Sequence, residues 1–414
     1  MASSSFAPLR RRNFSLALSS SFISSIGTWM QSVAMGVYLT ETTHNNIWLG
    51  MMTAAGWLPS IVGSPIGGVV ADRRHRQSWI QLQNVIMALT AIALAVLQLT
   101  HHLQPLVCVL LAIVEGVCSS ASWAAWQSLL PDLVGEGEVL AAVSLSSAQF
   151  NLGRIFGPMV AGIVLAVASP GWCFAANAAS FIAVVIIFSF VQTTPRNVHH
   201  EVVSFTQQVR QGARAAWSQP SCRYAIIAVG VVAILLSPFI ALIPSMAIQT
   251  LHSGRVGTSW MMMAQGLGAV MGAVSVPNLA RRTSRRFVSL LSATGMCCGV
   301  IAYGASPNLW AASLLLVVMG ASYIGILSGL NTAVQLHAPL PERSRILALY
   351  TMSLSICYPI GALIQAALSH LIGLRAVTSL FGAVALLGLV AIALWRPQIV
   401  STISATPDTT TRQE

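Results

Sequence analysis

Where one long apolar run, at about 47–71, ends and before the next begins, at about 79–100, the chain reads Gly68-Val69-Val70-Ala71-Asp72-Arg73-Arg74-His75-Arg76. Each flanking run reaches the roughly 20 apolar residues that a helix needs to cross a bilayer. A short segment with one acid and three arginines therefore joins two apolar helices at a membrane surface. This pattern predicts a chain that crosses a membrane rather than a soluble domain.

The composition of the whole chain leads to the same conclusion. Of its 414 residues, 55% are apolar and only 7% are charged, whereas a soluble domain carries about 25% charged residues. A soluble fold cannot cover its surface with so few charges, but a chain surrounded by lipid needs no more.

The net charge of +11 arises from 21 arginines without a single lysine. These arginines form short clusters between apolar runs, which is a topology signal rather than a nucleic-acid surface. A chain without lysine has no phosphate-loop lysine and no Schiff-base lysine. The seven cysteines show no metal-ligand spacing with histidine. We therefore expect no enzyme, no metal site and no cofactor.

Twelve apolar runs predict an all-α integral membrane protein with two pseudo-symmetric bundles of six helices. We expect an N-terminal bundle at 1–192, a cytoplasmic linker at 193–221, a C-terminal bundle at 222–396 and a disordered cytoplasmic tail at 397–414. The predicted spans are 14–40, 47–71, 79–100, 105–130, 139–168, 171–192, 222–250, 256–280, 287–306, 308–336, 345–372 and 374–395.

Within the linker, apolar residues recur at helical spacing, and Arg210 and Arg214 lie one turn apart on another face. This spacing favours an amphipathic helix on the cytoplasmic membrane surface, with the arginines toward anionic headgroups. The alternative is a solvated linker.

The orientation of the chain follows from the distribution of arginine. If the N-terminus is cytoplasmic, eighteen arginines lie on the cytoplasmic side, only Arg255 and Arg375 lie outside, and Arg154 lies within a span. This bias predicts a multi-pass protein of the bacterial inner membrane with both termini in the cytoplasm.

The two halves of the chain also resemble each other. Arg73-Arg74 follows the second predicted span and Arg281-Arg282 follows the eighth, 208 positions later. Parallel repeats of this kind are a transporter architecture, with the substrate path between them.

The loop after the second span resembles the signature of the major facilitator superfamily, G-x-x-x-D-R-x-G-R-R, and departs from it at His75 and Gln77. In that family the charge cluster is a conformational latch between the halves. The resemblance assigns this role to Gly68, Asp72, Arg73, Arg76, Arg343 and Arg345. The alternative is an arginine loop that only sets topology.

A second resemblance lies in the fifth predicted span, at Gly153, Gly157, Pro158 and Gly162. It is similar to the G-x-x-x-G-P-x-x-G-G pattern of antiporter-type facilitators, with Ala161 in place of one glycine. Small residues at this spacing let two helices approach closely, and the proline bends the helix. The pattern favours export over import.

Segments such as Tyr358-Pro359-Ile360-Gly361-Ala362 resemble the siderophore-exporter and drug-efflux branch of the same superfamily. The resemblance implies alternating access and proton-coupled export of a small amphiphilic molecule. It implies a monomer whose partners are its substrate, protons and the bilayer, with no nucleic acid. Two alternatives are a nutrient-importing facilitator and a non-transporting membrane scaffold or sensor.

Two ionisable residues lie near the middle of predicted spans, Glu115 in the fourth and Arg154 in the fifth. Because the two spans are sequential and antiparallel, we expect a Glu115–Arg154 ion pair. Such groups are costly in a membrane and are functional candidates. The pair is either a proton-coupling site or a permanent structural bridge. The other acids include Asp132, Glu136 and Glu138, which we expect to be solvated or to face the arginines at 281–286.

An amphiphilic substrate requires an amphipathic cavity, and polar or aromatic residues within the spans are candidates for its lining. The alternative role for each of them is helix packing or a place in an interface belt. They are Trp29, Gln31, Trp57, Trp123, Gln149, Asn151, Gln265, Tyr323, Asn331 and Gln365.

Overall fold

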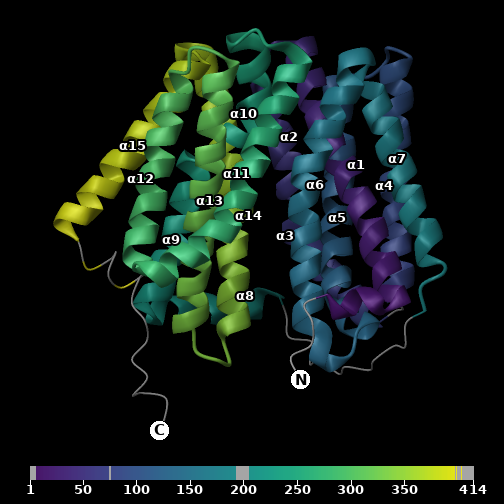
Figure 1. The fold of residues 1–414 in the computed structure, drawn as a ribbon, viewed down its shortest axis with the longest axis horizontal. Helices are drawn as coiled ribbons and strands as arrows, with labels where there is room; N and C mark the ends of the chain where they lie inside the picture. Colours follow the sequence, from purple (N-terminus) through teal and green to yellow (C-terminus); the bar gives the residue numbers. More distant parts are fainter. Residues whose placement is uncertain (1–5, 74–75, 193–204, 397, 399–401, 403–414) are drawn as a thin grey trace. The chain divides into compact units, whose positions relative to one another are not determined.

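The computed structural model describes residues 6–73, 76–192, 205–396, 398 and 402, and gives only the backbone of 68–73, 136, 205, 206 and 208. Nearly all of the described chain is helical (Figure 1). The helices are α1 (Arg12–Thr43), α2 (Ile47–Trp57), α3 (Ser60–Arg73), α4 (Arg76–Leu99), α5 (Pro105–Leu133), α6 (Val139–Val167), α7 (Pro170–Phe188), α8 (Phe205–Ser218), α9 (Pro220–Leu235), α10 (Phe239–Ser245), α11 (Gly254–Arg282), α12 (Arg285–Gly304), α13 (Leu309–His337), α14 (Arg343–Ile372) and α15 (Leu374–Trp395). The predicted tail lies outside the described residues, apart from 398 and 402.

Ten helices in the described part of the chain are long and apolar enough to cross a membrane. The segment Pro220–Thr250, which joins α9, α10 and a short π-helix (Met246–Thr250), counts as one of the ten. Helix α1 is 32 residues long but rich in serine and threonine, and the second predicted span is divided into α2 and α3. The chain is an all-α, multi-pass membrane protein, as its hydropathy predicted.

Prolines explain where these spans are interrupted. Pro59 lies between α2 and α3, and Pro238 lies between α9 and α10. A proline has no N–H to donate and its ring displaces the preceding turn, so a helix tends to end just before it.

The chain forms two compact units. Unit 1 comprises 1–200 together with 243–263, and unit 2 comprises 201–242 together with 264–414. The sequence predicts that 243–263 belongs to the C-terminal bundle, whereas in the structure this segment packs with N-terminal helices. Gly36 of α1 meets the ring of Pro244, and Gly162 of α6 meets Ser259.

The same helix pairings recur within each unit. In unit 1, α1 packs against α6 and α7, and α4 packs against α5 and α7. In unit 2, α9 packs against α14 and α15, and α12 packs against α13 and α15. The internal repeat expected from the sequence is therefore present in the packing.

Glycines make one of these repeated contacts possible. A Cβ at Gly67 of α3 would collide with the backbone of Ala121 in α5, and a Cβ at Gly272 of α11 would collide with Ala321 in α13. Only glycine lets the two helix backbones approach so closely at these positions.

The linker contains the expected helix, α8, and this helix lies against α14. Its inner face is made of small residues, with Ala216 fully buried and Gly212 against Arg345. Arg210 and Arg214 are exposed. The helix is therefore held by unit 2 through its small face, and contact of its basic face with lipid stays a prediction.

Candidate functional site

Helices α1 and α4 of unit 1 each place a polar side chain against the carboxylate of Glu115 in α5. Gln31 of α1 donates a hydrogen bond from Nε2 to Glu115 Oε2 at 2.7 Å. Thr90 of α4 places its Oγ1 at 2.9 Å from Glu115 Oε1. Each carboxylate oxygen therefore has one polar partner from a neighbouring helix.

A fourth helix, α7, fixes the orientation of Gln31. Asn177 Nδ2 donates to Gln31 Oε1 at 2.8 Å, and the Ser180 hydroxyl lies 3.0 Å from Asn177 Oδ1. Both Gln31 and Asn177 are buried. Because the carbonyl of Gln31 is occupied by Asn177, its amide nitrogen must face Glu115.

The Thr90 hydroxyl gives this network two complete hydrogen-bonding arrangements. Its oxygen lies 2.8 Å from the carbonyl of Met87 and 2.9 Å from Glu115 Oε1, but a hydroxyl has only one proton. When Glu115 is ionised, Thr90 donates to it. When Glu115 is protonated, Glu115 donates to Thr90, and Thr90 donates to Met87. The site can therefore hold or release a proton with the Glu115–Thr90 contact satisfied in both states.

The predicted ion pair of Glu115 with Arg154 is not formed. Glu115 contacts Gln31 and Thr90, while the Arg154 guanidinium lies 5.3 Å from the ring centroid of Trp29. The reason lies in helix packing: α5 packs mainly against α3 and α4, whereas α6 packs mainly against α1. The sequential helices α5 and α6 are therefore not close neighbours.

Arg154 belongs instead to an aromatic cluster formed by α1, α5 and α6. Trp29 and Phe150 are in edge contact with centroids 6.1 Å apart, and Trp123 and Phe150 are 5.7 Å apart. Trp123 and Phe150 are also exposed, at 47% and 40%. We call Trp29, Trp123, Phe150 and Arg154 the aromatic surface of unit 1. Of its four members, Phe150 had not been anticipated.

Several other predicted cavity residues have amide groups that are hydrogen-bonded within the protein, either to a neighbouring helix or within their own helix. Gln149 donates to the carbonyl of Ser21 in α1, and Asn151 donates to Ser147 in its own helix. In α13, Asn331 accepts from Gln335. These amides therefore have partners within unit 1 or unit 2, and their contact with a substrate stays a prediction. Trp57 is exposed and Gln265 is buried.

Tyr323 and Gln365 lie at the interruption between α9 and α10 in unit 2. The Tyr323 hydroxyl is 3.2 Å from Ser237 Oγ, and Gln365 Nε2 donates to the carbonyl of Leu235 at 2.9 Å. These contacts satisfy polar groups that the helix break leaves open.

The residues of the predicted latch are only partly visible. For Gly68, Asp72 and Arg73 the structure describes the backbone alone. Arg76 pairs with Asp132 at 2.5 Å and donates to the carbonyl of Ser128 at 3.2 Å.

In unit 2, Arg345 lies in the first turn of α14 and contacts Gly212 of α8. Among the described residues, Arg343 Nε is buried without a hydrogen-bond partner. Two of the loop acids have partners in unit 1 and are not simply solvated: Asp132 pairs with Arg76, and Glu138 pairs with Arg11.

The glycine motif of α6 lies along its contacts with neighbouring segments. Gly153 meets Ser25 of α1, and Gly157 meets the Cβ of Trp29. Pro158 is buried in the same stretch, and Gly162 meets Ser259.

Sequence reasoning missed Thr90 and Asn177. Neither carries a charge, and a hydroxyl or amide within an apolar run is common in membrane helices. A search along the sequence for polar residues one helix turn from Glu115 would also have missed both, because Thr90 lies in α4 and Asn177 lies in α7, whereas Glu115 lies in α5.

The apolar spans, and the helix pairings that recur in the two units, are those of a membrane transporter with the major facilitator fold. A point mutant of the nucleoside transporter NupG aligns with a TM-score of 0.79 and 12% identity, over 93% of this chain and all of that one. A bacterial homologue of the lysosomal transporter Spinster aligns with a TM-score of 0.72 and 12% identity, over 96% of this chain and 99% of its own. At these identities the likeness establishes the fold alone.

The sequence model of one family, the transmembrane secretion effectors, matches residues 3–412, and the chain belongs to this family. It is therefore a transporter and not an enzyme.

Bacterial relatives of the chain have named activities. The enterobactin exporter EntS of Citrobacter koseri is 26% identical over 327 residues, which are 78% of this chain and 76% of that protein. The multidrug efflux pump Tap of Mycolicibacterium fortuitum is 26% identical over 360 residues, or 84% and 87% of the two chains. The staphyloferrin A transporter of Staphylococcus aureus is 28% identical over 170 residues, or 41% and 43%.

Proposed function

We propose that this protein exports a small amphiphilic molecule, such as a siderophore or a drug-like compound, by alternating access driven by protons. The observation that carries the proposal is the Glu115 carboxyl, which has hydrogen-bond partners suited to both its charged and its neutral state. The relatives named as exporters and efflux pumps support the direction of transport.

In this proposal Glu115 binds the coupling proton. Protonation removes a charge from a network that spans α1, α4, α5 and α7, and it reverses the direction of the Thr90 hydrogen bond. If protonation changes the interaction energy of this network in one conformation more than in another, it shifts the relative populations of the two conformations. Helix α1 carries both Gln31 of this network and Trp29 of the aromatic surface. It therefore links the proton site to the aromatic surface.

The aromatic surface is proposed to bind the substrate. Exposed rings of Trp123 and Phe150 provide flat apolar area, and Arg154 provides a fixed positive charge beside it. This combination suits a molecule with an aromatic or aliphatic body and an acidic group. The latch role of Gly68, Asp72, Arg73, Arg76, Arg343 and Arg345 is part of the same proposal, as the control of access.

The test is transport in proteoliposomes loaded with substrate, with and without an imposed pH gradient. The panel contains enterobactin, staphyloferrin A and lipophilic cations, and the variant is Glu115→Gln. A glutamine at 115 can accept from Gln31 and donate to Thr90, so it reproduces the protonated arrangement. We expect it to keep downhill exchange and to lose gradient-driven export by at least about tenfold, equivalent to 1.4 kcal/mol.

The matched control is Glu138→Gln, which changes a carboxylate to an amide at an ion pair on the surface of the same unit. Gradient-driven export that survives in Glu115→Gln would make Glu115 a structural residue. Acid-dependent uptake instead of extrusion would favour an importer, and no transport of any compound would favour the scaffold.

A further inference from the structure

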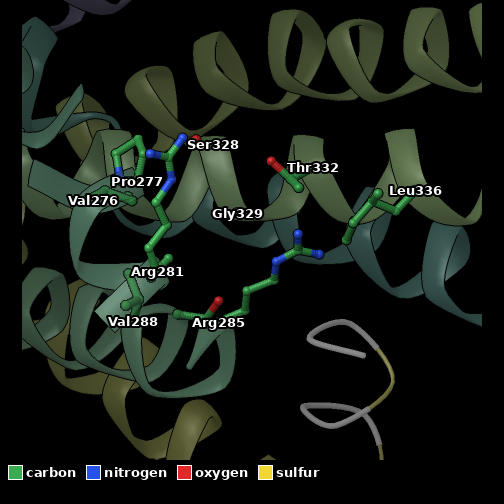
Figure 2. A pocket seen from close by; sticks show the side chains of 13 residues that line it. Val276, Pro277, Arg281, Arg285, Val288, Ser328, Gly329, Thr332 and Leu336 are labelled. Carbon is green, nitrogen blue, oxygen red and sulfur yellow. The ribbon is translucent and has the colours of Figure 1, made fainter. Parts of the chain in front are cut away.

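A pocket of about 450 Å³ opens within unit 2, among α11, α12 and α13 (Figure 2). It takes residues from the end of α11, the start of α12 and one stripe of α13. The α13 stripe repeats at helical spacing, with Gly325, Ser328, Gly329 and Thr332 on one face. The pocket is thus a product of three packed helices and not of a loop.

Two arginines supply the charge of this pocket. Arg281 ends α11 and Arg285 begins α12, and their side chains extend along the pocket toward Ser328 and Thr332 (Figure 2). No carboxylate is among the described residues that line the pocket. In the described part of the chain, neither arginine has an ion-pair partner. The positive charge in this pocket is therefore not neutralised by its own walls.

Three hydroxyl groups face the same space, on Ser289, Ser328 and Thr332. Many helical hydroxyls in this protein donate to a carbonyl one turn earlier, as Thr40 donates to Gly36 at 2.8 Å. Within the described residues, the three pocket hydroxyls make no such bond and remain available as donors. Guanidinium and hydroxyl donors together are the groups that bind oxyanions in proteins.

The rest of the lining is apolar, with Val276, Pro277 and Leu336 beside the arginines. We propose that this pocket binds the oxyanion group, a phosphate or a carboxylate, of an amphiphilic molecule whose apolar part lies against these side chains. The proposal holds whether the protein exports, imports or does neither, because it concerns binding alone. The molecule is either a soluble metabolite or a lipid, and the two sources share the same head-group chemistry.

The test uses the rate at which a thiol in the pocket is modified. Ser328→Cys is made in a chain with Cys298→Ser and Cys357→Ser, since Cys298 is exposed, Cys357 is partly exposed and the other five cysteines are buried. The full-length protein is placed in phosphatidylcholine nanodiscs and treated with anionic or cationic methanethiosulfonate reagents of similar size. Two adjacent positive charges should make the anionic reagent react faster by on the order of tenfold.

Two kinds of variant test the proposal independently: one removes the positive charges of the pocket, and the other fills its volume. Arg281→Gln with Arg285→Gln should bring the two rates together, whereas Arg375→Gln in α15 should leave the ratio unchanged. Gly329→Leu keeps both arginines but fills the pocket, and should slow both reagents. A side chain fits at Gly329, because a Cβ there would meet only Ser289 Oγ, at 3.4 Å. Elution of each variant as a single species in gel filtration shows that it is folded.

Two ligands then identify the source of the oxyanion. Protection of the thiol by inorganic phosphate would support a soluble ligand, and protection by phosphatidylglycerol in the nanodisc would support a lipid head group. Equal rates for the two reagents, a ratio that survives loss of both arginines, or protection by neither ligand would overturn the proposal.

Discussion

The guanidinium of Arg255 and the carboxylate of Glu41 form two parallel hydrogen bonds, Nε to Oε1 at 2.8 Å and Nη2 to Oε2 at 2.9 Å. Glu41 lies in the last turn of α1, and Arg255 lies in the first turn of α11. The pair joins the segment 243–263 to the N-terminal helices of unit 1. Both side chains remain partly exposed, so solvent limits the strength of the pair.

We expect Glu41→Gln to loosen the start of α11. Loss of a partly exposed pair costs about 1 kcal/mol, which is a factor of about five in a local opening equilibrium. Hydrogen–deuterium exchange of the amides at 254–258 should rise accordingly. The double reversal Glu41→Arg with Arg255→Glu should restore slow exchange, and unchanged exchange in Glu41→Gln would show that the pair does not hold this segment.

Replacement of Gly157 by alanine should force α1 and α6 apart. A Cβ at this position would lie 2.9 Å from the carbonyl of Ile26 and would collide with the Cβ of Trp29. Overpacking of this kind costs about 1–3 kcal/mol, and the melting temperature in detergent should fall. Gly56→Ala is the control, since a Cβ there would have no neighbour within 4 Å. Equal melting temperatures for both variants would contradict the close approach.

The two ion pairs near the α5–α6 connection should differ in their contribution to stability. The side chains of Arg76 and Asp132 are 14% and 4% exposed, whereas those of Arg11 and Glu138 are 48% and 22% exposed. Asp132→Asn leaves a partly buried guanidinium without its counter-charge and should cost about 3 kcal/mol. Glu138→Gln should cost less than about 1 kcal/mol. Chemical unfolding in detergent measures both, and a reversed order would refute the assignment.

Trp123→Ala tests the aromatic surface as a substrate contact. The ring is half-exposed and touches Phe150, so its loss should cost about 0.5–1.5 kcal/mol of binding. The apparent KM for a transported compound should rise about two- to tenfold with the maximal rate unchanged. Trp395→Ala, at the exposed end of α15, should leave both constants unchanged. A fall in maximal rate without a change in KM would argue against substrate contact.

Features that depend on neighbours in the sequence could be predicted. The apolar runs predicted the helices. The arginine pairs 208 positions apart predicted a repeat, which the packing of Gly67 and Gly272 reproduces.

Partners of Glu115 could not be predicted, because they depend on which helices become neighbours. The order of the spans favoured Arg154, yet α6 packs against α1 through Gly157, and Glu115 is met by Gln31 and Thr90 from α1 and α4. The oxyanion pocket arises in the same way, from the convergence of three helices. Hydropathy and helix breaks are local properties, so one sequence is enough to establish them. Contacts between spans depend on how side chains interlock in three dimensions, and only the packed structure establishes those.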